Sequence, residues 1–225
     1  MVAPYVIPPA STQLLLCIAA DWDSPAGELQ CFTRSADGNW QPDGQPLPVM
    51  LGRSGLAWGR GLHPLMAGTA KQEGDGRAPA GVFSITALFG YAPADAPLPR
   101  AARLPYHPAR PGLKCVDDPA SGHYNCIVDA AGVPGDWASC EDMLRDDRRY
   151  ELGAVVAHNM DPPLPGAGSC IFLHVWETPE TPTSGCTAMA LAHMERIARW
   201  LDAARAPVLV QLPESEYARH QQAWG

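Results

Sequence analysis

The chain has 225 residues, enough to bury a complete hydrophobic core, and this length favours one domain over two. Its formal net charge of −8 at pH 7 and the lack of a Lys/Arg run argue against a nucleic-acid partner. The 24 prolines and 21 glycines argue against a helical bundle and predict short strands joined by many turns.

The N-terminal segment contains the longest apolar run, over residues 14–20, which is far shorter than the ~18–20 residues of a membrane span. No basic segment precedes the run and Asp21 follows it, so we interpret it as a strand and not as a signal peptide. We therefore expect no membrane span. Whether the chain is a mature form or acts where it is made stays open at this stage.

Residues 1–10 contain three prolines and are expected to form an irregular arm ahead of a single domain over 11–225. The proline-punctuated segment 40–52 has room for one further short strand, and the glycine-rich segment 55–74 is expected to hold two local turns. Apolar or alternating runs bounded by turn residues predict the other strands at 12–20, 28–34, 81–86, 152–157, 170–175 and 208–210.

Less regular segments separate these strands. Prolines dominate 91–111, which predicts a long surface excursion, and the polar segment 140–150 is predicted to contain a short helix. Apolar residues at helical spacing predict an amphipathic helix over 190–204, which Pro207 would end. The pattern as a whole predicts one mainly β domain with a few short helices.

The seven cysteines fit six paired residues and one reactive thiol. Cys115 and Cys126 flank a turn-rich loop that a hairpin disulfide could close, and Cys17 could meet Cys31 on the next strand. Pairing would indicate an oxidising compartment such as a periplasm, although free, buried cysteines are an equal alternative. No CxxC or tight Cys/His cluster is present, so no metal site is expected.

The most informative segment is 183–188, in which Gly185 precedes Cys186. A glycine allows a tight turn that opens the thiol to a substrate, and the N–H groups of Gly185, Cys186 and Thr187 could face a developing oxyanion. His174 lies twelve residues earlier, at the end of the apolar run 170–173. An imidazole and a thiol in this order indicate acyl transfer through a thioester. The alternative is a buried structural cysteine.

Six further residues are candidates for substrate contact: Thr183, Ser184, Trp176, Arg77, His158 and Asn159. Each also has a structural interpretation. Ser184 is favoured as a helix or turn cap, Trp176 could simply pack, and Arg77 could form a loop salt bridge with Asp75 or Glu73. His158 is favoured as a hydrogen-bonded core histidine over a second catalytic imidazole, and Asn159 as a turn residue is at least as plausible.

Residues 166–189 resemble the catalytic signature of the L,D-transpeptidases of the YkuD type, through segment 168–174 and then 182–186. The glycine-rich segment 71–83 is similar to that family's Thr-Pro-x-Gly-x-Phe strand, and the resemblance covers about 70–212. Many members have histidine where this chain has Ser184 and a longer spacing between the histidine and the cysteine. The difference implies a truncated loop beside the site.

The resemblance implies a β-barrel or sandwich fold and a cysteine acyltransferase that needs no cofactor. Cys186 would attack peptidoglycan stem peptides between the third, diamino acid residue and the fourth, D-amino acid residue. His174 would take the thiol proton and later activate the acceptor, which is an amine (crosslinking), a free D-amino acid (exchange) or water (L,D-carboxypeptidase).

The resemblance also implies a monomer in the periplasm or cell envelope. Two alternatives use the same fold: a non-catalytic wall-binding module and an exported effector that degrades another cell's wall. A papain-like or NlpC-type cysteine peptidase is disfavoured, because those enzymes have the cysteine before the histidine.

Overall fold

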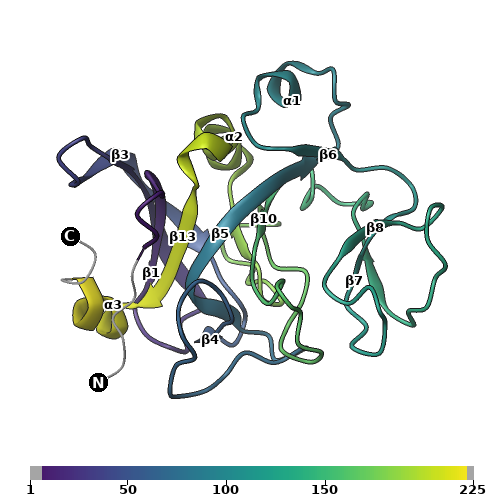
Figure 1. The fold of residues 1–225 in the computed structure, drawn as a ribbon, viewed down its shortest axis with the longest axis horizontal. Helices are drawn as coiled ribbons and strands as arrows, with labels where there is room; N and C mark the ends of the chain where they lie inside the picture. Colours follow the sequence, from purple (N-terminus) through teal and green to yellow (C-terminus); the bar gives the residue numbers. More distant parts are fainter. Residues whose placement is uncertain (1–6, 222–225) are drawn as a thin grey trace.

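Eight strands follow one another around a closed sheet in the computed structural model, which describes residues 7–221 (Figure 1). The order is β10-β11-β12-β3-β2-β1-β13-β5, and β5 pairs again with β10, so the sheet closes into a barrel. The bounds are β1 Gln13–Ala19, β2 Ala26–Arg34, β3 Trp40–Met50, β5 Ala78–Gly90, β10 Leu152–Val156, β11 Phe172–Val175, β12 Thr187–Met189 and β13 Val208–Pro213. The predicted mainly β, barrel-like fold is confirmed.

A strand near the start of the described chain and one near its end pair side by side in the barrel. β1 runs parallel to β13, with Leu14 opposite Val208, and antiparallel to β2. Nearly all residues of β1 and β13 are buried, because each of these strands has a partner on both sides and their side chains fill the barrel core. The two apolar runs recognised in the sequence are therefore central strands and not edge strands.

One amphipathic helix, α2 (Leu191–Trp200), packs against β10 and β11 through Met194, Ile197 and Ala198. It ends earlier than the prediction of 190–204, because Leu201 is extended. Asp202 then caps a separate 3₁₀ turn, η1 (Ala203–Arg205), by accepting the N–H of Ala204.

A second, three-stranded sheet lies beside the barrel, at the right of Figure 1, in the order β8-β7-β9. Its strands are β7 Leu113–Val116, β8 Ile127–Asp129 and β9 Cys140–Asp142. The helix predicted in 140–150 is wrong: this segment begins with β9, which pairs with β7, and continues in turns. We call residues 113–142 the side sheet.

A disulfide between Cys115 and Cys170 joins the side sheet to the segment just before β11. The pairing of Cys115 with Cys126 is therefore wrong. Cys115 lies opposite Ile127, so Cys126 is one residue out of register and its side chain points to the other face of the pleat. Cys17 and Cys31 are free and buried, because Cys31 lies two residues along β2 from the partner of Cys17.

The remaining elements lie between or outside the barrel strands. The segment expected to hold one short strand forms the eleven-residue β3, and the glycine-rich segment contains β4 (Leu56–Trp58). The excursion 91–111 contains α1 (Pro97–Ala101) and β6 (Tyr106–Pro108), and α3 (Glu214–His220) follows β13 without having been predicted. No helix within residues 7–221 is long and apolar enough to cross a membrane.

Most of the predicted N-terminal arm, residues 1–6, lies outside the described residues. Ile7 is already buried in the barrel core, and Ser11, two residues before the start of β1, is buried too. The described chain therefore joins the core before residue 10, where the prediction had the arm end.

Candidate functional site

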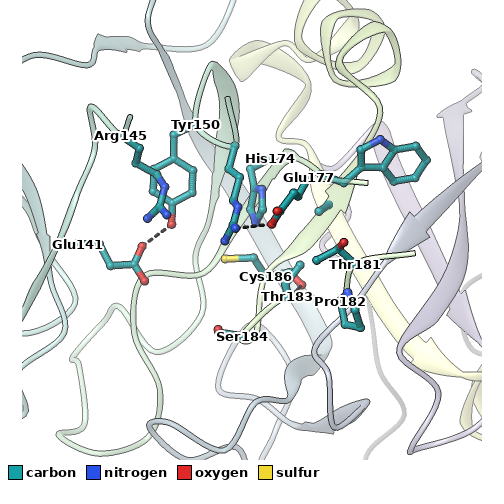
Figure 2. Close-up of a pocket in the computed structure, with 13 residues that line it drawn as sticks. Glu141, Arg145, Tyr150, His174, Glu177, Thr181, Pro182, Thr183, Ser184 and Cys186 are labelled. Carbon is teal, nitrogen blue, oxygen red and sulfur yellow. Dashed lines mark hydrogen bonds and ion pairs between the residues drawn. The ribbon is translucent and has the colours of Figure 1, made fainter. Parts of the chain in front are cut away.

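Two neighbouring parallel strands set the position of the predicted nucleophile and base. β11 carries His174, and β12 begins directly after Cys186, with His174 opposite Ala188. Both side chains line one cavity of about 130 Å³, in which Figure 2 draws them together. The chain thus brings together two residues that sequence reasoning had paired by their spacing.

The Cys186 thiol is held by backbone groups of the strand beside it. Sγ accepts the N–H of Phe172 at 3.3 Å and faces the carbonyl oxygen of Cys170 at 3.5 Å, to which the thiol donates. Cys186 is 9% exposed, and burial raises its pKa to about 12, with the nearby Glu141 carboxylate acting in the same direction. The sulfur is consequently a neutral thiol at neutral pH.

The His174 imidazole is oriented by the backbone of its own strand. Nδ1 lies 2.8 Å from the carbonyl oxygen of Val175, which can only accept, so the proton is on Nδ1 and Nε2 is left as the basic nitrogen. The ring is 6% exposed and meets the Tyr150 ring edge-on at 5.5 Å. Burial lowers the pKa of His174 to about 4, so the imidazole is neutral over the physiological range.

The turn before Cys186 is closed by a threonine. The Thr183 hydroxyl donates to the carbonyl oxygen of Cys186 at 2.6 Å, and the N–H of Gly185 donates to the same hydroxyl at 3.1 Å. Gly185 has φ +155°, and a Cβ there would lie 3.1 Å from the Arg77 carbonyl oxygen, so the turn suits glycine. Of the three N–H groups expected to face an oxyanion, that of Gly185 is engaged in this turn, and Thr187 is a buried residue of β12 paired with Leu173 of β11. The N–H of Cys186, between the turn and the strand, is the remaining candidate.

Three of the residues expected to contact a substrate line the cavity: Thr183, Ser184 and Trp176. Ser184 accepts a hydrogen bond from Arg53 Nη1 at 3.2 Å. This contact to another loop is not the turn cap that we favoured for Ser184.

Arg77 lies elsewhere. Its guanidinium donates to the carbonyl oxygens of Trp22 and Leu56 and forms an ion pair with Asp23 at 2.9 Å. The side chain lines a different cavity beside Trp22, so only the Arg77 backbone approaches the Gly185 turn.

His158 and Asn159 also lie outside the cavity that holds Cys186, and both stabilise a loop. His158 is 1% exposed; its Nδ1 accepts the N–H of Arg60 at 3.2 Å and its Nε2 donates to Ala167 O at 2.9 Å. The Asn159 amide binds Leu164 and Gly168 of the loop that precedes β11. The favoured structural interpretation of these two side chains agrees with their contacts.

Several cavity residues were not found from the sequence. They come from β9, from the turns after it, from the loop after β11 and from β12: Glu141, Arg145, Arg149, Tyr150, Glu177, Thr181, Pro182 and Ala188. The Tyr150 hydroxyl donates to Glu141, and the Arg145 guanidinium lies 5.1 Å from the centre of the Tyr150 ring (Figure 2). The high density of charged residues in 140–150 was the signal in the sequence that could have identified this part of the cavity.

No group of three or more His, Cys, Asp or Glu side chains among residues 7–221 is arranged to hold a metal ion. The lining of the cavity offers a thiol, an imidazole, carboxylates and guanidinium groups.

Comparison with known proteins gives one match. The family model of the L,D-transpeptidase catalytic domain (YkuD) matches residues 38–210. The match includes β3, β5, β10, β11 and β12 entirely and the first half of β13, whereas β1 and β2 precede it. No curated protein and no solved structure matches the chain. Because the match spans most of the chain, from β3 to β13, and includes both Cys186 and His174, the protein belongs to the L,D-transpeptidase catalytic domain family.

Proposed function

We propose that the protein is a cysteine-dependent L,D-transpeptidase that acts on the tetrapeptide stems of peptidoglycan through a thioester acyl-enzyme. Family membership implies a peptidoglycan substrate. The observation that carries the proposal is the cavity shared by Cys186 and His174, in which the free Nε2 of the imidazole is the nitrogen able to take the thiol proton.

The first half-reaction forms the thioester. Cys186 Sγ attacks the carbonyl carbon of the third residue while its proton moves to His174 Nε2. The tetrahedral oxygen is stabilised by the backbone N–H of Cys186, a contribution of about 3 kcal/mol per donor in comparable sites. When the intermediate collapses, the C–N bond breaks and the leaving D-amino acid takes the proton from His174.

The second half-reaction reverses the proton's path. An amine, a free D-amino acid or water gives a proton to His174 Nε2 as it attacks the thioester carbonyl, and Cys186 leaves and is reprotonated. The first two acceptors produce a crosslink or an exchanged stem, and water produces a tripeptide. All three outcomes share the same acyl-enzyme.

Burial favours a neutral starting pair for this chemistry. With the pKa of Cys186 at about 12 and that of His174 at about 4, an ion pair before substrate binds would be strongly unfavourable. Proton transfer therefore accompanies the attack itself, as in general-base catalysis.

The proposal includes a periplasmic or cell-envelope location, where the substrate is found. The Cys115–Cys170 disulfide supports it, because disulfides persist in oxidising compartments.

The test is incubation of the protein with a purified disaccharide-tetrapeptide and mass spectrometry of the products. Cys186→Ala is expected to abolish turnover with an unchanged circular dichroism spectrum. His174→Ala is expected to reduce turnover almost as far, because the two side chains act as one unit. Cys126→Ala, which removes an exposed free thiol, is the matched control and should retain full activity.

The products also identify the acceptor. Loss of the terminal residue indicates hydrolysis, a dimer indicates crosslinking, and incorporation of added D-methionine indicates exchange. Turnover by the Cys186→Ala protein would contradict the mechanism.

A further inference from the structure

A second cavity, of about 370 Å³, shares no lining residue with the catalytic cavity among those that the structure describes. It opens between the turn from β1 to β2, strand β4, the segment after β4, and helix α3, near the lower end of the barrel in Figure 1. We call it the tryptophan cavity, because Trp22 and Trp58 line it. Its volume falls in the range of small-ligand pockets, roughly 300–1,000 Å³, and the proposed reaction uses none of its side chains.

Two indole rings form the apolar part of this cavity. Trp58 is 5% exposed, whereas Trp22 is half-buried and keeps part of its ring open to a ligand. The rings meet edge to face, with their centroids 4.8 Å apart, so Trp22 is held against a fixed neighbour. The cavity therefore offers a flat apolar surface in a set orientation.

The charged side chains of the tryptophan cavity are already neutralised. The Asp23 carboxylate, 81% exposed, pairs with Arg77 at 2.9 Å, and Glu216 of α3 pairs with Arg219 at 2.7 Å. These pairs present donors and acceptors without an excess charge of either sign. They consequently favour a neutral ligand with many hydroxyl groups, which can accept from Arg77 and donate to Asp23, over an ion that would need a counter-charge.

The backbone at the edge of this cavity is also satisfied, which argues against an extended peptide as the ligand. β4 is the last strand of its sheet, the position where a peptide adds as a further strand. The N–H of Leu56 donates to Trp22, the N–H of Trp58 donates to Thr69, and the Trp58 carbonyl accepts the N–H of Lys71. The Leu56 carbonyl accepts a guanidinium N–H. An added strand would have to displace these bonds.

We propose that the tryptophan cavity binds a neutral saccharide, a segment of the β-1,4-linked N-acetylhexosamine chain that carries the stem peptides. The apolar face of a sugar ring packs on Trp22, and its hydroxyl groups bond to the pair of Asp23 and Arg77. The identity of the saccharide rests on the proposed function, whereas its chemical class follows from the rings and the balanced charges.

One layer of chain separates this site from the nucleophile. In the segment between β3 and β4, the N–H of Arg53 donates to the Thr183 carbonyl, and three residues later Leu56 bonds to Trp22. Arg77 also contacts both sides, since its guanidinium lines the tryptophan cavity and its carbonyl oxygen borders the Gly185 turn. A glycan bound here lies beside the turn at which its stem peptide would react.

Calorimetry with the wild-type protein tests the site without turnover. The probe is a tetramer of β-1,4-linked N-acetylglucosamine, which has no stem peptide and no charge. We expect it to bind with an affinity that does not change between roughly 0.05 and 0.5 M salt, because no ionic contact is screened. The cationic glucosamine tetramer should bind more weakly, and a free stem tetrapeptide should not displace the probe.

Variants assign the contacts to their residues. Trp22→Ala should weaken binding of the probe at least tenfold, and Asp23→Ala about three- to tenfold, the size of one lost hydrogen bond. Because the Asp23 side chain is exposed, its loss tests the site even if removal of Trp22 disturbs the fold. Trp137→Ala, in the side sheet and outside both cavities, is the matched control and should bind as the wild type does.

Four results would overturn the inference: no binding of the probe, wild-type affinity in both the Trp22 and Asp23 variants, tighter binding of the cationic tetramer, or displacement by the free tetrapeptide. The last result would assign the cavity to a peptide. Turnover of the disaccharide-tetrapeptide by a protein that does not bind the probe would contradict this inference alone. Binding of the probe by a protein without turnover would contradict the proposed function and leave the saccharide site in place.

Discussion

At the scale of single residues, burial decides the protonation state of the predicted catalytic pair. Cys186 and His174 are both held in their neutral forms, because burial raises the pKa of the thiol and lowers that of the imidazole. The two backbone contacts of Sγ orient the thiol but do not offset the loss of water around a sulfur anion.

The rate at which iodoacetamide alkylates each cysteine at pH 7 should therefore follow the exposure of that cysteine. Cys126 is exposed and should react first, whereas Cys186 is expected to react roughly 10- to 1,000-fold more slowly, because so little of it is thiolate. Cys17 and Cys31 should stay unmodified in the folded protein. Peptide mass mapping over time measures each site, and Cys186 reacting as fast as Cys126 would be incompatible with a buried thiol.

Slow alkylation also bears on the alternative of a non-catalytic wall-binding module. A thiol that resists a small alkylating agent is expected both from that module and from the buried pair described above. The distinction requires the substrate, because only a catalytic thiol forms a thioester with a stem peptide.

The sequence predicted those site residues that can be recognised from their immediate neighbours along the chain. Cys186 with Gly185, and His174 at the end of an apolar run, could be found because each depends on its immediate neighbours. Glu141 could not be placed, because it enters the cavity through the pairing of β9 with β7, and no local pattern encodes that register.

At the scale of elements, the side sheet supports the nucleophile from behind. Cys170 is bonded to Cys115 of β7, and its N–H donates to Asn125 Oδ1 at 2.9 Å, between β7 and β8. The carbonyl of the same Cys170 receives the Cys186 thiol. The disulfide thus joins two segments 55 residues apart at the point where the sulfur is held.

Replacing this disulfide should weaken both the fold and the thiol's environment. The Cys115→Ala/Cys170→Ala protein is expected to lose about 4 kcal/mol of unfolding free energy, from the entropy of the closed loop, and to alkylate faster at Cys186. Urea unfolding and mass mapping measure the two effects. Cys126→Ala/Cys140→Ala removes two unpaired cysteines from the same sheet, and an equal loss in that control would show that the disulfide is not the cause.

The predicted helices and strands were correct where an apolar run forms a strand of the barrel. They were wrong where the structure of a segment depends on pairing with a strand far away in the sequence. The helix expected in 140–150 rested on polarity alone, and β9 is a strand only because β7 lies beside it. The hairpin disulfide failed for a similar reason, since the register of β7 with β8 turns Cys126 away from Cys115.

At the scale of the whole molecule, buried histidines couple the stability of the barrel to pH. His158 is held by two hydrogen bonds inside the protein, and burial lowers its pKa to about 4, below the ordinary 6.5. Above pH 6.5 the ring is neutral in both the folded and the unfolded chain. Below that value the unfolded chain binds a proton first, so stability falls as the pH falls.

The free energy of unfolding should decrease by roughly 3 kcal/mol for His158 between pH 6.5 and pH 4, at 1.36 kcal/mol per pKa unit. His174 adds a decrease of the same sign. Urea unfolding from pH 4 to 7 measures the slope, which His158→Gln should flatten. The exposed His107→Gln is the control, and a His158→Gln protein with the wild-type slope would contradict the assignment.

The parallel contact between β1 and β13 has a consequence for synthesis on the ribosome. After β1 has left the exit tunnel, it cannot gain its parallel neighbour until almost two hundred further residues have followed, because Leu14 pairs with Val208. Barrel closure is therefore a late, non-local event with a high entropic cost, and maturation of this protein is expected to be slow and to follow translation.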